Sequence, residues 1–323
     1  MMVKAIVQDH YGAAESLRFD DVARPGVGDG DVLVQVVAAG VDRGALHFMT
    51  GRPYLMRLGT GLRSPKVTVP GVSFAGRVEA VGSQAGRFAA GDEVYGAARG
   101  TYAEYVAAPQ RKIAPKPREL SFEEAAVLPY AAFAALQAVR DHGRVRPGER
   151  VLVVGASGAV GSVAVQVAKA DGAEVTGVCG PRGQQLAASI GADHVLDYTR
   201  EDFADGSRTF DVIIDVFGRT PIARLRRALT PRGRLVITGG EGDRWVGGTQ
   251  RQLGATLLSP FVGQSLRAFV AKENTETLET LNDLLAQGKV RPVLGRTYPL
   301  TEAADAVTAL ESGSTSGRIV LTI

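Results

Sequence analysis

The 323-residue sequence has little of several residue types, and each shortage excludes a class of protein. Its one cysteine, Cys179, rules out an intramolecular disulfide and a structural zinc site of four cysteines. The longest apolar run, 125–136, is too short to span a bilayer and contains Pro129. The start, from Met1 to Val7, lacks the ordered regions of a secretory signal and predicts a strand. We therefore expect a protein of a reducing compartment, by default the cytoplasm, with no membrane partner.

Net charge is also small. The 37 Lys and Arg nearly balance 34 Asp and Glu, which leaves +3, and the sequence contains no long basic run. This balance does not favour a nucleic-acid partner. The content of 45% hydrophobic and 22% charged residues is typical of a globular protein, and the length favours two domains.

Residues 1 to about 122 have the pattern of strands and glycine-rich turns. The run 32–37 is apolar and rich in valine, which favours a pleated sheet, and Gly26, Gly28 and Gly30 precede it. Shorter segments at 78–81 and 91–96 also combine a strand pattern with glycine. This part of the chain predicts a mostly β domain.

The pattern changes at Ser121, where Ser121 and Glu124 form a capping box that predicts a helix start. From 151 to about 240, predicted strands (151–154, 174–179, 211–215 and 234–238) alternate with predicted helices (158–169 and 184–190). Such alternation predicts a parallel, doubly wound sheet and an α/β fold. Further on, Asn274 can cap a helix that ends at Gly288, and two more strands are predicted at 296–300 and 318–323.

The most specific local signal is the run Gly155, Ala156, Ser157, Gly158, Ala159, Val160 and Gly161, between a predicted strand and a predicted helix. Gly155 allows a tight turn, Gly158 lets the backbone approach a pyrophosphate, and Gly161 lets the helix pack close to the sheet. The helix N-terminus offers N–H groups and a positive dipole end to the anion. The run predicts a dinucleotide-binding loop; the alternative is a tight corner without a ligand.

The end of the second predicted strand distinguishes the two nicotinamide cofactors. NAD sites place Asp or Glu there, ~20 residues or more past the glycines, to bind the ribose. Here Gly180 and Arg182 follow the strand and no carboxylate does. Arg182 could pair with a 2′-phosphate, which favours NADPH, or it could be a solvated residue at a helix start. We add Gly239 and Gly240, which follow the predicted strand 234–238, to the expected cofactor residues.

Residue types that carry other chemistry are sparse. The four histidines show no metal-ligand spacing; they are His10, His47, His142 and His194. Cys179 is expected to be a small buried residue rather than a nucleophile, and Ser157 lacks the Gly-x-Ser-x-Gly context of a hydrolase. The cofactor, rather than a protein nucleophile or a metal, should therefore carry the chemistry.

With these motifs in view, the chain resembles the medium-chain dehydrogenase/reductase superfamily, in particular its zinc-free quinone oxidoreductase (zeta-crystallin-like) branch. The resemblance covers nearly the whole chain. It rests on the stretches GVSFAGRVEAVG (71–82), GDEVYG (91–96), VLVVGASGAVG (151–161) and GADHVLDY (191–198).

The resemblance implies a GroES-like β-barrel catalytic domain in residues 1–122, a Rossmann domain in 123–265, and a return to the catalytic domain in 266–323. It places the active site in the cleft between the domains and implies that Tyr198 and Arg182 hold the 2′-phosphate. Zinc-containing relatives have a Cys after the Gly near position 40 and a Gly-His-Glu at position 71. Here those places read Val41-Asp42 and Gly71-Val72-Ser73, so the ligands are missing.

Three positions depart from the branch, which usually has Asn at Asp42, an acidic residue near Ala45 and Asp at Ser73. The Asn normally lies near the nicotinamide, but Asp42 could also be only a capping residue of its loop. Tyr54 aligns with a tyrosine at the mouth of the branch's active site. It could donate a proton or hydrogen bond to a substrate oxygen, or it could be packing. Tyr54 and Asp42 are the catalytic candidates.

The sequence therefore predicts an NADPH-dependent, zinc-free oxidoreductase that reduces a quinone or the activated double bond of an enone. Two alternatives stay open: a non-catalytic NADPH-binding protein with a redox-sensing or structural role, and a carbonyl or alcohol dehydrogenase. A small molecule is the expected substrate, and by resemblance the protein is a homodimer.

Overall fold

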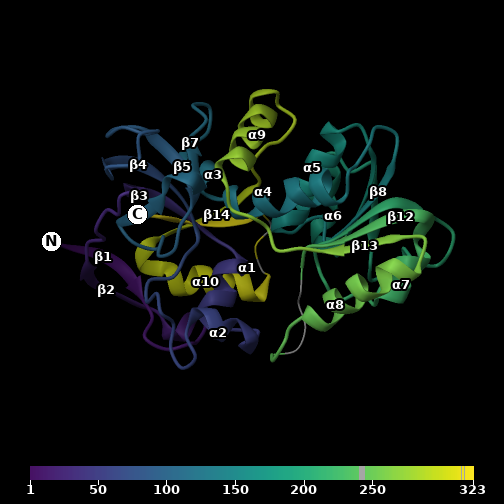
Figure 1. The fold of residues 1–323 in the computed structure, drawn as a ribbon, viewed down its shortest axis with the longest axis horizontal. Coiled ribbons are helices and arrows are strands. Elements are labelled where there is room, and N and C mark those ends of the chain that lie inside the picture. Colours follow the sequence, from purple (N-terminus) through teal and green to yellow (C-terminus); the bar gives the residue numbers. More distant parts are fainter. Residues whose placement is uncertain (240–243, 314, 316) are drawn as a thin grey trace. The chain divides into compact units, whose positions relative to one another are not determined.

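The computed structural model describes residues 1–239, 244–313, 315 and 317–323. The chain divides into two compact units (Figure 1). The first, here called the β unit, contains Met1–Tyr130, Glu273–Asp283 and Pro292–Ile323. The second, the Rossmann unit, contains Ala131–Lys272 and Leu284–Arg291. No helix in the described part of the chain combines the length and the apolar character needed to cross a membrane.

The β unit is built on a seven-stranded sheet in the order β14-β15-β3-β4-β5-β7, with β6 paired to β3. Its strands are β3 (Asp31–Val41), β4 (Ser73–Val81), β5 (Glu93–Ala97), β6 (Tyr105–Pro109), β7 (Ile113–Pro115), β14 (Leu294–Pro299) and β15 (Arg318–Thr322). All neighbours are antiparallel except β14 and β15. The last strand thus joins the first part of the chain. A separate hairpin pairs β1 (Met2–Val7) with β2 (Arg18–Ala23).

Valines at alternate positions of β3 explain its place at the centre of this sheet. Val32, Val34 and Val36 are buried in the core of the unit, because side chains two apart point to the same face of a strand. Around the sheet lie the helices α1 (Arg43–Thr50), α2 (Arg57–Thr60), α3 (Phe122–Ala126) and α10 (Ala303–Ser312). The capping box predicted at Ser121 is confirmed at the start of α3.

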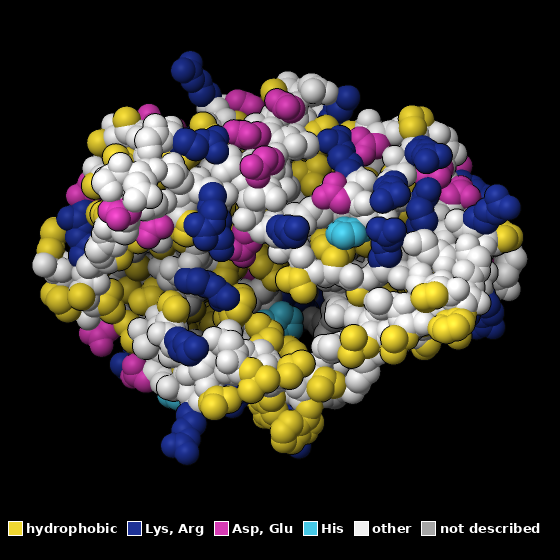
Figure 2. All heavy atoms as spheres, viewed as in Figure 1, with side chains coloured by type: hydrophobic (Ala, Val, Ile, Leu, Met, Phe, Trp, Pro, Cys, Tyr) yellow, Lys and Arg dark blue, Asp and Glu magenta, His cyan; other side chains and the backbone are white. Residues whose placement is uncertain are grey.

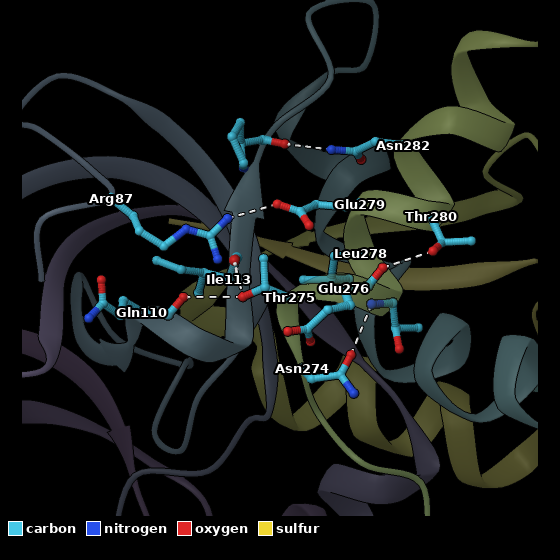
Figure 3. Close-up of polar contacts among 12 residues, drawn as sticks. Arg87, Gln110, Ile113, Asn274, Thr275, Glu276, Leu278, Glu279, Thr280 and Asn282 are labelled. Atoms are coloured by element: carbon cyan, nitrogen blue, oxygen red, sulfur yellow. Dashed lines mark hydrogen bonds and ion pairs between the residues drawn. The ribbon is translucent and has the colours of Figure 1, made fainter.

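Helix α9 (Thr275–Ala286) begins in the β unit and packs on its sheet (Figure 3). Asn274 accepts a hydrogen bond from the Thr277 amide at 2.9 Å, which confirms the predicted cap. The Thr275 hydroxyl donates to the carbonyl oxygens of Ile113 and Gln110, and Asn282 donates to the Pro115 carbonyl. These bonds fix the helix against β7 and the turn before it.

The Rossmann unit contains a six-stranded sheet in the order β10-β9-β8-β11-β12-β13, and every neighbouring pair is parallel. Its strands are β8 (Arg150–Val154), β9 (Glu174–Cys179), β10 (His194–Asp197), β11 (Phe210–Asp215), β12 (Leu229–Ile237) and β13 (Ser265–Ala268). This order is that of a doubly wound sheet, whose direction of progression reverses between β8 and β11. The predicted α/β class is confirmed.

Helices cover both faces of this sheet. Figure 1 shows α5 (Ala159–Ala170) and α6 (Gln184–Ser189) on one side and α7 (Ile222–Arg227) and α8 (Thr249–Leu258) on the other. Helix α5 is buried all round, since every residue from 161 to 168 is buried. In such a fold the carboxyl ends of the strands at the reversal point are where a ligand binds.

Candidate active site

The glycine loop joins the end of β8 to the start of α5. Gly155 has a φ of +91°, a conformation that side chains disfavour. A β-carbon at Gly161 would overlap the Gly155 carbonyl oxygen, so only glycine lets the helix approach the turn so closely. At Gly158 an added β-carbon would meet only the Gly155 carbonyl oxygen, at 3.2 Å, a tight contact but not an overlap. The two outer glycines are needed by the fold and the middle one is not.

The N-terminus of α5 is suited to an anion. Its N-cap is Gly158, which has no side chain that could accept hydrogen bonds from the first backbone amides. The first turn contains no acidic residue. Helix N-termini carry a partial positive charge and point their amides outward, so a phosphate is stabilised there. Ala159 and Val160 form this first turn, and Ala156 is buried beneath it.

The end of β9 gathers the residues predicted to distinguish NADPH from NADH. The Tyr198 side chain, 62% exposed, lies against Gly180, where an added β-carbon would be 3.2 Å from its hydroxyl. Arg182 belongs to the 3₁₀ turn Pro181–Gly183 and is exposed. Ser157 of the glycine loop contacts Gly183, the last residue of that turn. The structure thus brings Ser157, Gly180, Arg182 and Tyr198 together at one edge of the sheet.

The carboxylate next to this edge is already hydrogen-bonded within its own region of the chain. Asp197, paired in register with Cys179, accepts hydrogen bonds from the Thr199 amide and hydroxyl and from Gln184. The Thr199 amide is the main reason that the pKa of Asp197 lies below its usual value. Asp197 is also only 5% exposed, so the edge presents an arginine and a phenol instead of a ribose-binding carboxylate.

A buried ion pair at the end of β11 escaped the sequence analysis. Asp215 is fully buried, and its carboxylate pairs with Arg251 of α8 and accepts from the Gly218 amide at 3.1 Å. Arg251 also donates to the Thr220 carbonyl at 2.8 Å. The pair ties α8 to the turn 216–218 after β11. Because sequence patterns do not show which side chains meet across a turn, nothing in the sequence singled out Arg251.

The turn 216–218 contacts two of the predicted cofactor residues. The Phe217 amide nitrogen would be 3.4 Å from a β-carbon on Gly155, and a β-carbon on Gly239 would overlap the Val216 carbonyl. Gly239 therefore lies where β12 ends beside β11, at the same sheet edge as the glycine loop. Gly240, the other predicted glycine, lies outside the described residues.

In the β unit, Asp42 is the N-cap of α1. Its Oδ1 accepts from the Ala45 amide at 2.9 Å, so the carboxylate caps the helix. The residue is 8% exposed, and this burial raises the pKa of Asp42 to about 6, although the Ala45 amide and the positive charge of Arg318 act in the opposite direction. The capping role that the sequence left open is therefore present.

Arg318 is the charged neighbour of Asp42, and the sheet register explains why. Strand β15 pairs with β3 so that Ile319 lies opposite Val41, which places Arg318 beside Asp42. Burial lowers the pKa of Arg318 to about 10, while the negative charge of Asp42 raises it. The charge of Asp42 also raises the pKa of the buried Tyr102 and of the partly buried Tyr130, after the larger effect of desolvation. Asp42 thus belongs to a buried polar cluster.

Tyr54 lies beyond the other end of α1, in the 3₁₀ turn Tyr54–Met56. Its half-buried ring packs on the Arg57 guanidinium, whose carbon is 4.5 Å from the Tyr54 ring centre and 4.2 Å from that of Tyr11. Arg57 also donates to the carbonyl oxygens of Gly51 and Thr50. Helix α1, which begins after Asp42 and ends four residues before Tyr54, is about 12 Å long.

A metal site finds no support in the described part of the chain, where no three His, Cys, Asp or Glu side chains gather as ligands. Cys179 is buried, and burial raises the pKa of its thiol. A metal-independent reaction stays a prediction.

Comparisons with known proteins agree with this geometry. Residues 28–118 match the alcohol dehydrogenase GroES-like domain, and residues 190–321 match the zinc-binding dehydrogenase family. The chain is 33% identical to 2-methylene-furan-3-one reductase of Solanum lycopersicum, over 99% of this chain and 79% of that protein. It is 30% identical to the chloroplastic NADPH-dependent alkenal/one oxidoreductase of Arabidopsis thaliana, over the same shares of the two chains.

Among solved structures, the quinone oxidoreductase from Coxiella burnetii superposes over the full length of both chains with a TM-score of 0.88 and 28% identity. The fold, the sheet order and these relatives define a medium-chain oxidoreductase with a nicotinamide cofactor. The chain belongs to the medium-chain dehydrogenase/reductase superfamily, in its quinone oxidoreductase (zeta-crystallin-like) branch.

Proposed function

We propose that this protein is an NADPH-dependent reductase of quinones or of the activated double bond of enones. The observation that carries the cofactor choice is the edge at Gly180, where Arg182 and Tyr198 stand and Asp197 is held by Thr199. A guanidinium can bind a 2′-phosphate through two charge-assisted hydrogen bonds. The substrate class is supported by the names of the relatives: quinone oxidoreductase, 2-methylene-furan-3-one reductase and alkenal/one oxidoreductase.

In this proposal the glycine loop and the N-terminus of α5 bind the pyrophosphate, and Gly239 lets the ends of β11 and β12 approach that loop. The bound cofactor would supply a hydride to the electron-poor carbon of the substrate. Negative charge then develops on the substrate oxygen and is stabilised by a donor already in position. The Tyr54 hydroxyl is our candidate donor. Asp42 acts as a positioning residue, because it caps the helix that precedes Tyr54.

The direct test is NADPH oxidation, followed at the nicotinamide absorbance, with a panel of quinones and enones and with matched saturated ketones as controls. Turnover on quinones or enones alone supports the proposal. Turnover on saturated ketones alone would indicate a carbonyl reductase. Tight NADPH binding without turnover on any of them would indicate a non-catalytic role. Metal analysis of the same sample checks the expected absence of stoichiometric zinc.

Cofactor choice is tested by Arg182→Ala. Loss of a charge-assisted phosphate contact should weaken NADPH binding by about 1.5–3 kcal/mol and leave NADH binding unchanged. Fluorescence titration with both cofactors measures this, with Arg232→Ala, another exposed arginine of the Rossmann unit, as the control. Equal affinity of the unmutated protein for NADPH and NADH would show that the choice of NADPH is wrong. The homodimer and the cytoplasmic location stay predictions, the first open to sedimentation.

A further inference from the structure

A segment of the β unit around Tyr54 carries positive charge only. Residues 43–67, here called the basic segment, contain five cations and no Asp or Glu; the cations are Arg43, Arg52, Arg57, Arg63 and Lys66. Acidic residues are otherwise common in this unit, which has more Asp and Glu than Lys and Arg. The segment is therefore locally positive, although the β unit as a whole has a net negative charge.

The cations of this segment differ from the surface cations elsewhere in the β unit. Cations of the β unit outside the basic segment are commonly ion-paired, as in Lys4–Asp21, Arg18–Asp9, Arg87–Glu279 and Lys112–Glu273. Arg52, Arg63 and Lys66 are exposed, and within the described residues no carboxylate lies in ion-pair distance of any of them. Three cations are thus available to an anion from outside the chain.

Large apolar side chains are exposed between these cations. They are Leu55 (47%), Leu58 (71%), Leu62 (68%) and Val67 (52%). Leu55 and Leu58 are three residues apart in consecutive helical turns and so share a face. Figure 2 shows hydrophobic and basic side chains next to one another in the region of α2.

The backbone of the segment is held in place, so these side chains are presented by an ordered loop. The Lys66 amide donates to the Thr60 carbonyl at 2.8 Å, and a β-carbon on Gly61 would overlap the Ser64 carbonyl. The Tyr11 hydroxyl donates to the Gly61 carbonyl at 2.7 Å. Arg57, between the rings of Tyr11 and Tyr54, links this loop to the candidate donor.

We propose that the preferred substrate is an amphiphilic anion: an enone or quinone that carries an apolar chain and a carboxylate or phosphate. The leucines contact the chain, and Arg52, Arg63 and Lys66 attract the anionic group. This inference rests on the proposed function, because it assigns the basic segment to the substrate of the site that contains Tyr54.

The test compares a long-chain oxo-alkenoic acid with its methyl ester, two enones that differ by one charge. At low ionic strength kcat/KM should be about threefold to tenfold higher for the acid, through KM, and the preference should shrink as salt screens the charges. Arg63→Glu and Lys66→Glu should each lower kcat/KM for the acid about twofold to fivefold and leave the ester unchanged. Arg118→Glu, at an exposed arginine of the same unit outside the segment, is the control and should change neither.

The outcomes separate this inference from the proposed function. Turnover with equal kcat/KM for acid and ester would overturn the inference and leave the reductase intact, whereas no turnover on any enone or quinone would overturn both. A weaker NADPH affinity in Arg63→Glu would show that the segment faces the cofactor and contradict the assignment. Sedimentation with anionic phospholipid vesicles, in the absence of an acid preference, would show that the surface binds a bilayer instead.

Discussion

The two units of this protein carry charge of opposite sign. The Rossmann unit has 20 Lys and Arg against 13 Asp and Glu, whereas the β unit has 17 against 21. The excess of positive charge on the Rossmann unit would attract a cofactor that carries a pyrophosphate and a 2′-phosphate. The net charge of +3 for the whole chain conceals the difference. The net charge is therefore more informative for each unit than for the whole chain. The same holds for the basic segment, which is positive within a unit that is negative overall.

The units also differ in what holds their functional residues. In the Rossmann unit, backbone geometry places the predicted residues, since a side chain would strain the backbone at Gly155, with its φ of +91°, and would overlap it at Gly161. In the β unit, side-chain contacts hold Asp42 and Tyr54, through a helix cap and a stacked arginine. Glycine positions are visible in a sequence, but contacts between distant side chains are not. We therefore expect the first unit to be sensitive to added volume and the second to altered polar groups.

The largest effect is expected for Gly161→Ala. The new β-carbon would overlap the Gly155 carbonyl, so α5 must move away from the sheet, at a cost of about 3 kcal/mol in unfolding free energy, and NADPH binding should be lost. Gly158→Ala is the matched control, because its β-carbon would meet the same Gly155 carbonyl oxygen at 3.2 Å, a tight contact instead of an overlap. It should weaken NADPH binding with little change in the urea midpoint. If the two variants unfold at the same urea concentration, backbone packing does not explain the loop.

Next in size is Arg251→Met, which leaves the buried Asp215 carboxylate without its partner. We expect a loss of about 3 kcal/mol in unfolding free energy, measured by urea denaturation, and weaker NADPH binding through the turn 216–218. The double variant with Asp215→Asn removes the uncompensated charge and should recover part of the stability. A single variant as stable as the unmutated protein would show that the pair does not tie α8 to β11.

For the β unit, Tyr54→Phe should lower turnover about a hundredfold on the best substrate while NADPH affinity is unchanged, because a hydrogen-bond donor to the developing charge is lost. The matched control is Tyr11→Phe, which also stacks on Arg57 and loses a hydroxyl, but one that bonds to Gly61 and Thr60. Steady-state kinetics and fluorescence titration separate rate from affinity. Unaltered turnover in Tyr54→Phe would remove the phenol from the mechanism.

The sequence predicted most of the fold because the evidence for it is local. The caps at Ser121 and Asn274 and the valine-rich β3 each lie within a dozen residues, and the strand-glycine-helix unit is one continuous segment, 150–170. Strand β13 was missed because Ser265–Ala268 is only four residues long. Helix α1 was missed because its eight residues contain Gly44 and are followed by Gly51, and glycines mark turns as well as helix ends.

At the cofactor edge the pattern showed only the strand before Gly180 and Arg182, whereas Tyr198 follows β10 and came from the family resemblance. The partners of the other candidates were not predictable. Arg318 meets Asp42 only through the register of β15 on β3, and Arg251 meets Asp215 only through the fold of α8 onto β11. Both contacts join residues far apart in the chain, and no local spacing reports them.

The smallest effect is the pH dependence of stability at Asp42, where Arg318, Tyr102 and Tyr130 are the neighbouring ionisable groups. Its pKa rises from 3.8 in an unfolded chain to about 6 in the fold, so the folded state binds the proton more tightly. The resulting stability is complete below pH 3.8 and is lost as the pH rises to about 6. Asp42→Asn keeps the N-cap and removes the titration.

The difference in unfolding free energy between Asp42→Asn and the unmutated protein should therefore shift in favour of the variant between pH 4 and pH 7, by on the order of 2 kcal/mol. Taking the difference cancels the carboxylates with lowered pKa, such as Asp193 and Asp202, whose contribution has the opposite sign. Urea unfolding at several pH values measures it. A difference that is constant with pH would show that Arg318 keeps the Asp42 carboxylate ionised throughout. The charge of Asp42 would then be part of the cap in the β unit, as a fixed ion pair rather than a group that titrates near neutrality.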